Sequence, residues 1–402
     1  MRILQINTTV NSGSTGRIAE DIGGLIIKNS GKSYISFGRG NRSSSSKKIK
    51  IGNKLDVILH GLESSLFDRH GLGSKNATEK LIEEIEIIRP DIIHLHNVHG
   101  YYLNIKVLFD YLKTINKPLV WTFHDCWAFT GHCTYFDAVN CDKWKTLCNK
   151  CPNLKAYPSS LFIDNSKNNF NLKKQLFTAL DNVHIVTPSK WLANYVNESF
   201  LMEHSVQTIH NGIDLNIFKP LHALEIKNKY QIGKKKIILG VASIWDKRKG
   251  LLDFIELERR IDTSYQIILV GLNKRQLKEL PNSIIGIART ESLQELAALY
   301  SAADVFINPT YVDNFPTTNI ESLGCGTPVI TYNTGGSPEA IDHTTGVVVE
   351  KGDIDGLWAA INKLSSHSQE HYSKVCRLRA EKMFNKEDRY MDYLKLYERL
   401  IN

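Results

Sequence analysis

The sequence predicts an α/β protein built from two doubly wound, Rossmann-like domains. Short apolar runs alternate with helical patterns along almost the whole chain, which is typical of parallel sheets with crossover helices. The runs form two successive series, and 402 residues are too many for one hydrophobic core. The composition, with 42% hydrophobic and 23% charged residues, is that of an ordinary globular protein.

Each series contains five runs that we expect to form strands. The first series is Ile3–Ile6, Tyr34–Phe37, Ile92–Leu95, Leu119–Phe123 and His184–Thr187. The second is Ile237–Val241, Gln266–Val270, Asp304–Asn308, Pro328–Thr331 and Val347–Val349. Helical patterns lie between them at Ala77–Ile88, Trp191–Ser199, Ser292–Ala302 and Gly356–Leu364, and the last stretch, Asp388–Leu400, is amphipathic.

The segment at 210–220 is expected to join the two domains, because Asn211-Gly212 is a turn pair and Pro220 closes the segment. We predict an N-terminal domain over residues 1–212, with a cysteine-rich insert at 126–155. We predict a C-terminal domain over residues 213–384, followed by a helix within 385–402.

The net charge is +8, and nearly all of it belongs to the first half. Residues 1–210 hold 25 Lys and Arg against 18 Asp and Glu, a net of +7, and the remainder holds 25 against 24, a net of +1. This distribution fits a surface that faces lipid headgroups or phosphates, or one that serves solubility alone. Nucleic acid is disfavoured, because the basic residues are scattered and no binding motif is present.

We expect the protein to be cytoplasmic, with peripheral contact at the inner face of the cell membrane as an option. No apolar run is long enough to span a bilayer, and the short apolar stretch at the N-terminus indicates a strand rather than a signal peptide. Seven cysteines in such a chain suggest reduced thiols or a metal site rather than disulfides.

Ligands of open parallel sheets bind at the carboxyl ends of the strands, so the residues after each predicted strand are candidates. Gly13 and Gly16 follow the first strand and lead into a helix. Free N–H groups and the positive end of a helix dipole suit a phosphate there, although a plain strand-to-helix turn explains the glycines equally well. The spacing is not that of a dinucleotide-binding loop.

Polar and aromatic side chains follow the third strand. His94, His96 and His99 lie close together in the sequence, but strand alternation places only the first two on one face, which disfavours a metal. Asn97, His99 and Tyr101 better suit a loop that contacts a sugar or an acceptor.

His124 and Asp125 lie where the fourth strand ends. A neutral imidazole there can hydrogen-bond a substrate hydroxyl or carbonyl group. The alternative is a histidine that only caps the loop.

Four cysteines follow with the spacing C-x7-C-x6-C-x2-C: Cys133, Cys141, Cys148 and Cys151. The last pair has a spacing that suits tetrahedral zinc, although the first spacing is looser than usual. His132 is an alternative ligand. The insert therefore contains either a structural zinc site or free thiols.

In the second domain, Lys247, Arg248 and Lys249 precede Gly250 after a predicted strand. Cations at the start of a helix suit a diphosphate, and a solvated charge run is the alternative.

Two carboxylates, Asp313 and Glu321, lie eight residues apart after the strand that ends at Asn308. Pro316 can start a helix, which places Glu321 on the second turn. Carboxylates in these positions can accept hydrogen bonds from vicinal hydroxyl pairs, so each acid is expected to hold one sugar of a nucleotide-sugar. The small residues of 324–328 are expected to let this helix pack closely on its sheet.

Three blocks of the second domain, VASIWDKRKG, ELAALYSAADVFINPTYVDNFPTTNIESLGCGTPVI and NTGGSPE, resemble the retaining glycosyltransferases of family 4. The resemblance extends through TPSKWLA and VQTIHNGID back to QINTTVNSGSTGRIAEDI, and it covers nearly the whole chain. HNVHGYYLN and HDCWAFTGHC resemble a subgroup associated with capsule, O-antigen and exopolysaccharide assembly. The resemblance implies the GT-B fold, with a cleft between two Rossmann-like domains and a C-terminal helix that crosses back to the first domain.

The resemblance also implies roles for individual residues. Asp313, where Glu is more usual, would contact the transferred sugar, Glu321 would hold the nucleotide ribose, and Lys249 would bind phosphate. Ser243 stands where the family often has arginine, and Arg248 is a candidate for that second positive charge. The implied catalytic residues are His124, Asp313 and Lys249. The implied donor-binding residues are Gly16, Ser243, Arg248, Lys249, Asp313, Asn314, Phe315, Pro316, Thr317 and Glu321. The acceptor-side candidates are Asn97, His99, Tyr101 and Asp125.

We therefore expect a hexosyltransferase that moves a sugar from a UDP- or GDP-sugar to a glycan or lipid-linked acceptor and retains the anomeric configuration. Lys249, Arg248 and helix N-termini would stabilise the leaving diphosphate, so no cofactor is required for catalysis. A nucleotide-sugar epimerase of similar architecture and a catalytically idle nucleotide-sugar-binding protein are the alternatives. A dehydrogenase is disfavoured, because no dinucleotide fingerprint follows any strand.

Overall fold

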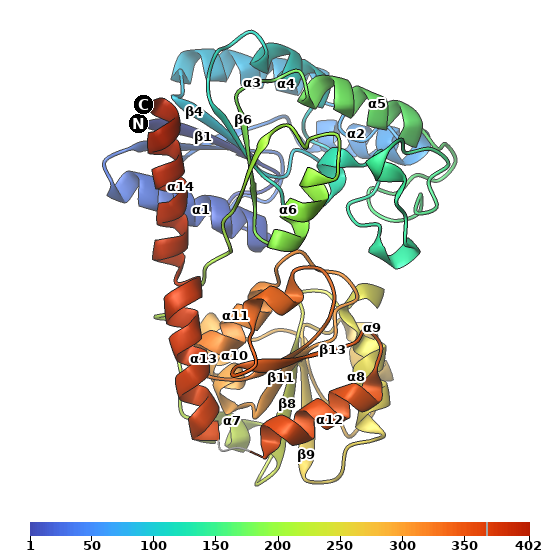
Figure 1. Cartoon of the computed structure of the whole chain (residues 1–402), viewed down its shortest axis with the longest axis vertical. Helices are drawn as coiled ribbons and strands as arrows, with labels where there is room; N and C mark the ends of the chain where they lie inside the picture. The colour runs from blue at the N-terminus through green and yellow to red at the C-terminus, as the bar shows by residue number, and fades with distance from the viewer. Residues whose placement is uncertain (367–368) are drawn as a thin grey trace. The chain divides into compact units, whose positions relative to one another are not determined.

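The computed structural model describes residues 1–366 and 369–402, and its contacts divide the chain into two compact units (Figure 1). Unit 1 comprises Met1–Ile209 and Tyr390–Asn402, and unit 2 comprises His210–Arg389. The return to unit 1 thus begins at Tyr390 rather than at 385. The reason is a pair of backbone hydrogen bonds in unit 2: Ile213 N–H donates to Phe384 O at 2.8 Å, and Lys386 N–H donates to Ile213 O at 3.0 Å.

Unit 1 contains a seven-stranded parallel sheet with the order β3-β2-β1-β4-β5-β6-β7. Its strands are β1 Arg2–Asn7, β2 Lys32–Phe37, β3 Lys47–Lys50, β4 Ile92–Leu95, β5 Leu119–Thr122, β6 Val183–Thr187 and β7 Ser205–Thr208. Its helices are α1 Gly13–Lys28, α2 Lys54–Phe67, α3 Lys75–Ile88, α4 Ile105–Leu112, α5 Ser166–Phe177, α6 Lys190–Asn197 and most of α14 Lys386–Ile401. The strand order reverses its direction between β1 and β4.

Unit 2 contains a six-stranded parallel sheet with the order β10-β9-β8-β11-β12-β13. Its strands are β8 Lys236–Val241, β9 Tyr265–Val270, β10 Ile285–Ile287, β11 Val305–Asn308, β12 Val329–Tyr332 and β13 Gly346–Val349. Its helices are α7 Leu224–Lys229, α8 Leu251–Glu258, α9 Lys274–Glu279, α10 Leu293–Ala302, α11 Thr317–Gly324, α12 Ile354–Ser365 and α13 Gln369–Phe384. Here the strand order reverses between β8 and β11. Two parallel sheets with crossover helices confirm the predicted fold class.

Three strands, β3, β7 and β10, were missing from the prediction, and each lies at an edge of its sheet. An edge strand pairs on one side only, and natural proteins keep such strands short and polar to prevent further pairing. β3 reads KKIK and β7 reads SVQT, so neither contains an apolar run. β10 has only three residues.

Helix α14 completes the core of unit 1. Its buried Tyr393 and Tyr397 pack in one cluster with Ile3 of β1, Ile22 of α1 and Val120 of β5. Tyr397 Oη lies 2.6 Å from Nδ1 of His94, a fully buried residue of β4. The C-terminal helix is therefore joined to the sheet by a buried hydrogen bond as well as by apolar contacts.

The small residues after α11 lie mainly against segments other than the sheet. A Cβ at Gly324 would lie 2.8 Å from Ile213 Cδ1, and a Cβ at Gly326 would lie 2.7 Å from Ser373 Oγ in α13. Arg377 of α13 also donates to Gly324 O at 3.1 Å. The expectation that this run packs α11 onto its sheet is corrected accordingly: it packs α11 against α13 and the segment after His210.

None of the helices in the described part of the chain combines the length and the apolar character that a membrane span needs.

We predict that Tyr397→Phe lowers the free energy of unfolding by about 1–3 kcal/mol, because it leaves the buried His94 Nδ1 without this partner. Urea denaturation of the full chain measures the effect. Lys395→Ala, on the exposed side of the same helix, is the matched control and should change the stability by less than ~0.5 kcal/mol. Equal effects of the two substitutions would contradict a stabilising role for this hydrogen bond.

Candidate active site

The candidate residues of each unit follow strands at or next to the point where the strand order reverses. In open α/β sheets, ligands bind at the carboxyl ends of the strands at this point. In unit 2, Lys249 follows β8 and Asp313 follows β11, and these two strands are neighbours. In unit 1, the loops after β1, β4 and β5 carry Gly16, the 97–101 segment and His124.

Lys249 and Asp313 form an ion pair in unit 2. Both side chains are about one-fifth exposed, so the pair is open to a ligand. Backbone contacts hold the two loops together: Tyr311 N–H donates to Arg248 O at 2.7 Å, and Thr310 Oγ1 donates to the same oxygen at 3.2 Å.

Two glycines allow the backbones of this site to approach closely. Gly250 has φ +72°, and a Cβ there would lie 2.3 Å from Pro309 O. Gly335 has φ +56°, and a Cβ there would lie 1.8 Å from Asp313 O. Gly336 N–H donates to that same Asp313 oxygen at 3.1 Å. Any other residue at 250 or 335 would push the charged loops apart, since the atoms in the way belong to backbone.

Glu321 lies on the second turn of α11, as the sequence predicts, and it is half-buried. Tyr300 Oη donates a 3.1 Å hydrogen bond to Glu321 Oε2. Burial, together with the Glu321 carboxylate, holds the pKa of Tyr300 well above its usual range, so the phenol keeps its proton and donates. Tyr300 was not among the predicted site residues.

The other predicted donor-binding residues occupy different environments. Ser243 is exposed. Arg248 pairs with Asp246, with Nε and Nη2 at 3.1 Å and 3.0 Å from Oδ2. The Phe315 ring stacks on His210, with centroids 4.7 Å apart, and the buried Asn314 precedes it. Pro316 is the N-cap of α11 and Thr317 is its first residue.

Gly16 lies in the first turn of α1, and a Cβ there would lie 2.6 Å from Thr9 Oγ1. Its Asn11 neighbour donates N–H to Gly16 O at 3.1 Å. The turn between β1 and α1 therefore requires a small residue at 16 for its own packing.

The acceptor-side candidates of unit 1 form one hydrogen-bonded cluster. Thr8 Oγ1, after β1, donates to the carbonyl oxygens of His99 at 2.8 Å and Asn97 at 3.1 Å. His99 Nε2 lies 2.9 Å from Asp125 Oδ2, and Trp127 N–H donates to Asp125 Oδ1 at 2.9 Å. Burial raises the pKa of Asp125, but the His99 interactions and the Trp127 N–H outweigh it and leave the pKa below its usual range.

Hydrogen bonds fix the tautomer of His124. The Gln5 amide donates to Ala19 O at 2.8 Å, so its oxygen accepts from His96 Nε2 at 3.0 Å. Burial and the imidazoles of His94 and His124 hold the pKa of His96 well below its usual range. His96 Nδ1 therefore accepts, and His124 Nε2 donates to it at 3.1 Å.

The Nδ1 atom of His124 is consequently an acceptor. Burial lowers the pKa of His124 to about 4, although Asp125 opposes this shift. The ring is therefore neutral at pH 7 and presents a lone pair that suits a hydroxyl donor. Gln5 was missed in the sequence, although one polar residue in the apolar run RILQIN is a visible signal.

Tyr157 is a second residue that the sequence did not indicate. Its Oη lies 3.3 Å from His99 Nδ1, and its ring meets that of Tyr101 at a centroid distance of 6.0 Å. Tyr101 adopts a left-handed backbone conformation, with φ +67°. The segment just after the insert thus contributes an aromatic side chain to the acceptor-side cluster.

The four insert cysteines line one small cavity of about 20 Å³, together with His132. All four are free thiols; Cys133 is buried and the other three are half-buried. Their sulfur atoms do not form a compact group: among the described residues, the one set of three potential ligands within 4.8 Å of one another is Asp68, His70 and His132.

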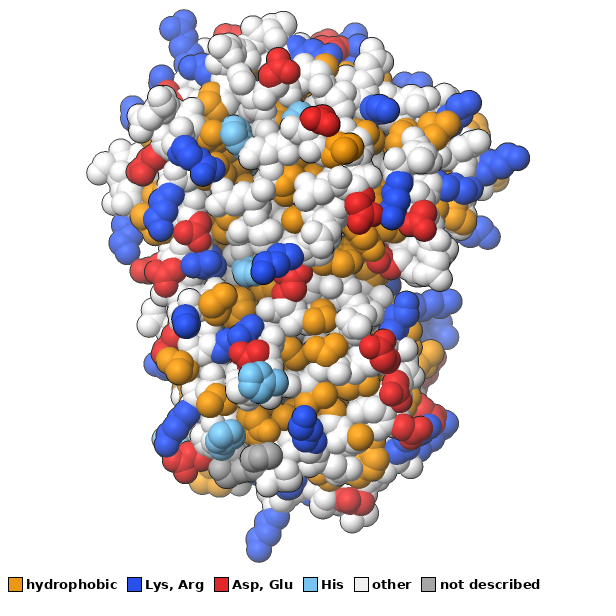
Figure 2. All heavy atoms as spheres, viewed as in Figure 1, with side chains coloured by type: hydrophobic (Ala, Val, Ile, Leu, Met, Phe, Trp, Pro, Cys, Tyr) orange, Lys and Arg blue, Asp and Glu red, His pale blue; other side chains and the backbone are white. Residues whose placement is uncertain are grey.

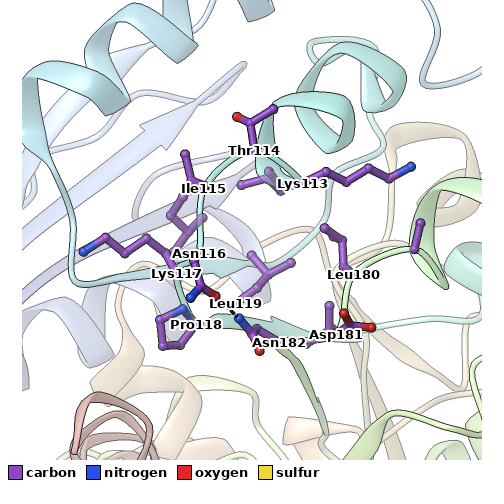
Figure 3. A pocket seen from close by; sticks show the side chains of 14 residues that line it. Lys113, Thr114, Ile115, Asn116, Lys117, Pro118, Leu119, Leu180, Asp181 and Asn182 are labelled. Atoms are coloured by element: carbon purple, nitrogen blue, oxygen red, sulfur yellow. Dashed lines mark hydrogen bonds between the residues drawn. The ribbon is translucent and has the colours of Figure 1, made fainter.

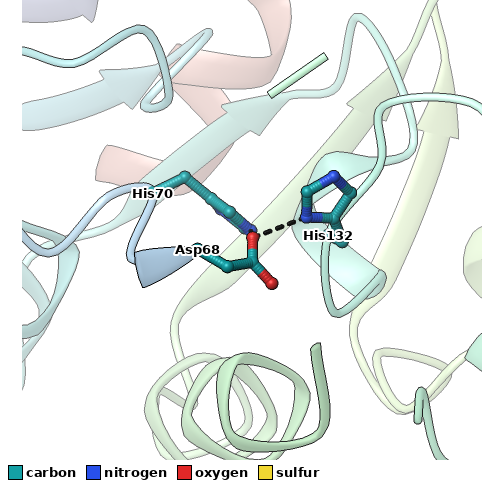
Figure 4. A group of neighbouring side chains, drawn as sticks. All are labelled: Asp68, His70 and His132. Carbon is teal, nitrogen blue, oxygen red and sulfur yellow. Dashed lines mark hydrogen bonds and ion pairs between the residues drawn. The ribbon is translucent and has the colours of Figure 1, made fainter. Parts of the chain in front are cut away.

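Within that set, Asp68 forms a buried ion pair with His132 (Figure 4). His132 Nδ1 lies 2.6 Å from Asp68 Oδ1. Burial lowers the pKa of His132, but the bond and the charge of Asp68 outweigh it and raise the pKa overall. Both ring nitrogens face oxygen acceptors, since Nε2 of His132 lies 3.4 Å from Ala156 O. Trp127 Nε1 donates to His70 Nδ1 at 2.8 Å, which leaves the proton of His70 on the nitrogen that faces Asp68. His132 therefore does not offer a lone pair to the cysteines.

A cavity of about 300 Å³ lies at the amino ends of the unit 1 strands, on the side of the sheet opposite the candidate site (Figure 3). Leu119 and Val183, the first residues of β5 and β6, are part of its lining, and Asn182 donates to Asn116 there at 2.6 Å. Because it lies at the amino ends of the strands, this cavity is separate from the candidate site.

Residues 52–217 match the family profile Glycosyltransferase Family 4, and residues 235–367 match Glycosyl transferases group 1. The chain belongs to the family 4 glycosyltransferases. Among the relatives of this glycosyltransferase is the "Putative colanic acid biosynthesis glycosyl transferase WcaC" of Escherichia coli, which is 27% identical over 368 residues and 88% of each chain.

Solved structures confirm the GT-B fold of this glycosyltransferase. Sucrose-phosphate synthase from Thermosynechococcus elongatus superimposes with a TM-score of 0.73 at 17% identity, covering 99% of this chain and 98% of that chain. HepE of Anabaena in complex with UDP-glucose superimposes with a TM-score of 0.69 at 14% identity, covering 99% of both chains.

We predict that Gly335→Ala impairs this glycosyltransferase more than Gly233→Ala does. Gly233 also has a positive φ, +66°, but no atom lies within 4 Å of the position that its Cβ would take, so its substitution tests conformational strain alone. The control should cost about 1–2 kcal/mol of stability. Gly335→Ala should cost more and also lower the rate of sugar transfer, because it displaces Asp313. Urea denaturation and initial rates measure the two effects; matching values for both variants would contradict the role assigned to this close approach.

Proposed function

We propose that this glycosyltransferase moves a hexose from a nucleotide-diphosphate sugar to a hydroxyl of a glycan or lipid-linked oligosaccharide, in the biosynthesis of a surface polysaccharide. The observation that carries the proposal is the grouping of Lys249, Asp313 and Glu321 after neighbouring strands of unit 2. A cation and two carboxylates match a diphosphate and two sugar rings in charge and in hydrogen-bonding capacity. The UDP-glucose complex of HepE supports a nucleotide-sugar donor, and the WcaC name supports the polysaccharide context.

In this proposal, Lys249 exchanges its contact with Asp313 for the donor diphosphate. Asp313 then accepts hydrogen bonds from hydroxyls of the transferred sugar, and Glu321, oriented by Tyr300, accepts from the ribose. Arg248 supplies a second cation when it leaves Asp246. Such charges stabilise the leaving group as the bond to the sugar breaks.

The proposed transfer retains configuration. The bond between the anomeric carbon and the diphosphate oxygen breaks, and the acceptor oxygen bonds to the same face of that carbon. The acceptor proton passes to the departing phosphate oxygen, so the products are a nucleoside diphosphate and a glycoside. We assign to His124 Nδ1 a hydrogen bond from a hydroxyl of the transferred sugar, and to Asn97, His99, Tyr101 and Asp125 the acceptor side.

We predict that one nucleotide family, UDP or GDP with its sugar conjugates, raises the melting temperature of the chain and that Glu321→Ala abolishes most of this rise. A ligand that binds only the folded state stabilises it by mass action. Glu370→Ala, on the exposed surface of α13, is the matched control and should retain the rise. No shift with any nucleotide would overturn the donor assignment.

The reaction class needs a separate assay. With donor and a polysaccharide-derived acceptor, proton NMR should show a new glycosidic linkage with the anomeric configuration of the donor. An epimerase would change the sugar nucleotide without an acceptor, and a binding protein would leave it unchanged. An inverted product would contradict the same-face route.

We also propose that Cys133, Cys141, Cys148 and Cys151 bind a structural zinc ion. Four thiolates around one small cavity are a suitable donor set, and the ion would draw the sulfur atoms together from their present positions. The proposal assigns zinc no part in the reaction.

We predict about one zinc ion per purified chain by elemental analysis, as expected for a four-thiolate structural site. The double variant Cys148→Ser/Cys151→Ser should lose the metal, whereas Cys376→Ser in unit 2 should keep it. A metal chelator should lower the melting temperature of the wild type and of Cys376→Ser, but not that of the double variant. Metal-free protein that melts at the same temperature with and without added zinc would identify these residues as free thiols.

A further inference from the structure

Helix α2 exposes its apolar side and buries its polar side. Five of its large apolar residues recur at helical spacing along one face, and these five are exposed: Leu55, Ile58, Leu59, Leu62 and Leu66. Leu55 is 67% exposed and Leu59 is 62% exposed. The buried residues of the helix are instead His60 and Ser64. A surface helix of a globular protein normally has the opposite arrangement.

Hydrogen bonds fix α2 in this orientation. His60 Nε2 accepts from the backbone N–H groups of Gly71 at 3.1 Å and Gly73 at 3.2 Å, and His60 Nδ1 lies 3.0 Å from Ser74 Oγ. Burial lowers the pKa of His60 to about 4, which keeps the ring neutral for these contacts. A rotation that buried the leucines would leave His60 and its backbone partners unsatisfied, and this would be costly.

The exposed face continues into the loop 161–163. Leu161, Phe162 and Ile163 are all exposed, Phe162 by 77%. The Leu161 N–H donates to Ser65 O in the last turn of α2 at 2.8 Å, so loop and helix are held together. Figure 1 shows α2 beside the green segment that leads into α5. We call these eight side chains of α2 and the loop the apolar surface.

The charge of unit 1 indicates what covers the apolar surface. Residues 1–209 and 390–402 hold 27 Lys and Arg against 20 Asp and Glu, a net of +7. Exposed lysines border the apolar surface in the sequence at Lys54, Lys155 and Lys167. Arg69 borders it too but pairs with Glu63 of α2 at 2.7 Å, and Asp164 is an exposed acid beside the loop. Figure 2 shows that Lys and Arg side chains are spread over the face in view. A second copy seated on the apolar surface would bring two units of the same charge together, whereas an anionic bilayer complements both the charge and the apolar residues.

We propose that the apolar surface docks this enzyme on an anionic lipid bilayer, with α2 lying in the plane of the headgroups. Leu59 and Phe162 would enter the acyl boundary, and the bordering cations would contact the headgroups. The docking itself does not depend on which sugar is transferred.

The apolar surface connects to the acceptor-side cluster of the same unit. The Tyr101 ring lies 5.9 Å from that of His60 and would be 3.8 Å from a Cβ on Gly61. Tyr157, which contacts His99, precedes the loop by four residues. Docking would thus bring His99 and Asp125 toward acceptors anchored in the same bilayer; this consequence rests on the proposed function.

The test is sedimentation of the full chain with vesicles of phosphatidylglycerol and phosphatidylcholine, and with vesicles of phosphatidylcholine alone. The wild type should bind the anionic vesicles, and high salt should weaken the binding. Leu59→Gln/Phe162→Gln should weaken it at least ~10-fold, as expected when two anchoring side chains no longer enter the apolar layer. Leu252→Gln is the matched control, because Leu252 is equally exposed on α8 of unit 2 and lies outside the apolar surface. Both variants replace exposed side chains, and an unchanged melting temperature would verify their folding.

Wild type that does not bind, or a double variant that binds as well as Leu252→Gln, would overturn the proposal. A dimer in analytical ultracentrifugation that the double variant dissociates, without vesicle binding, would assign the apolar surface to a second copy instead. The nucleotide-dependent melting shift separates failure of the docking proposal from failure of the proposed function. If the chain binds vesicles but no nucleotide shifts its melting temperature, docking stands and the donor assignment fails. If a nucleotide shifts the melting temperature but the chain does not bind vesicles, the donor assignment stands and docking fails.

Discussion

The candidate donor site depends on how closely three loops of unit 2 approach one another. The backbone carbonyls of Pro309 and Asp313 occupy the positions where side chains at Gly250 and Gly335 would begin. The hydrogen bond from Tyr311 N–H to Arg248 O then fixes the spacing of the loops. Lys249 and Asp313 are therefore placed by rigid backbone contacts. Charges held in this way need little reorganisation when a diphosphate leaves, which is the condition under which electrostatic stabilisation is most effective.

In unit 1 the corresponding constraint is a network of buried hydrogen bonds. The Gln5 amide determines which nitrogen of His96 carries the proton, and His96 in turn determines the tautomer of His124. The neighbouring His94 is held by Thr122 and by Tyr397 of the C-terminal helix. Gln5 of β1 and His96, which follows β4, thus define one acceptor atom on His124 at the carboxyl end of the sheet. The C-terminal helix adds a separate buried hydrogen bond, to His94.

The central strands of both sheets could be predicted because they are buried on both faces and therefore form continuous apolar runs. The edge strands could not, since a polar strand such as KKIK looks like a loop. The same division holds for the candidate site. Asp313, Lys249 and His124 could be named as candidates because they lie in the segments that follow apolar runs. Supporting partners were missed because they are distant in the sequence from the residues that they contact: Tyr300 lies 21 residues before Glu321, and Gln5 lies 91 residues before His96, which contacts His124.

Asp68 also links two features that the sequence presents as unrelated, the cysteine-rich insert and α2. It is the C-cap of α2, and its carboxylate accepts from His132 of the insert and from Asn165 N–H, at 2.6 Å and 2.9 Å. The insert also contacts the loop 161–163 of the apolar surface. Cys151 N–H donates at 2.6 Å to Asp164 Oδ2, and Asp164 is the residue directly after that loop. The insert, the loop and the end of α2 are therefore one hydrogen-bonded assembly. A zinc ion among the cysteines would restrict the backbone at Cys151 and, through Asp164, the position of Phe162. A metal with no role in the chemistry would in this way help to set the geometry with which the enzyme meets a bilayer.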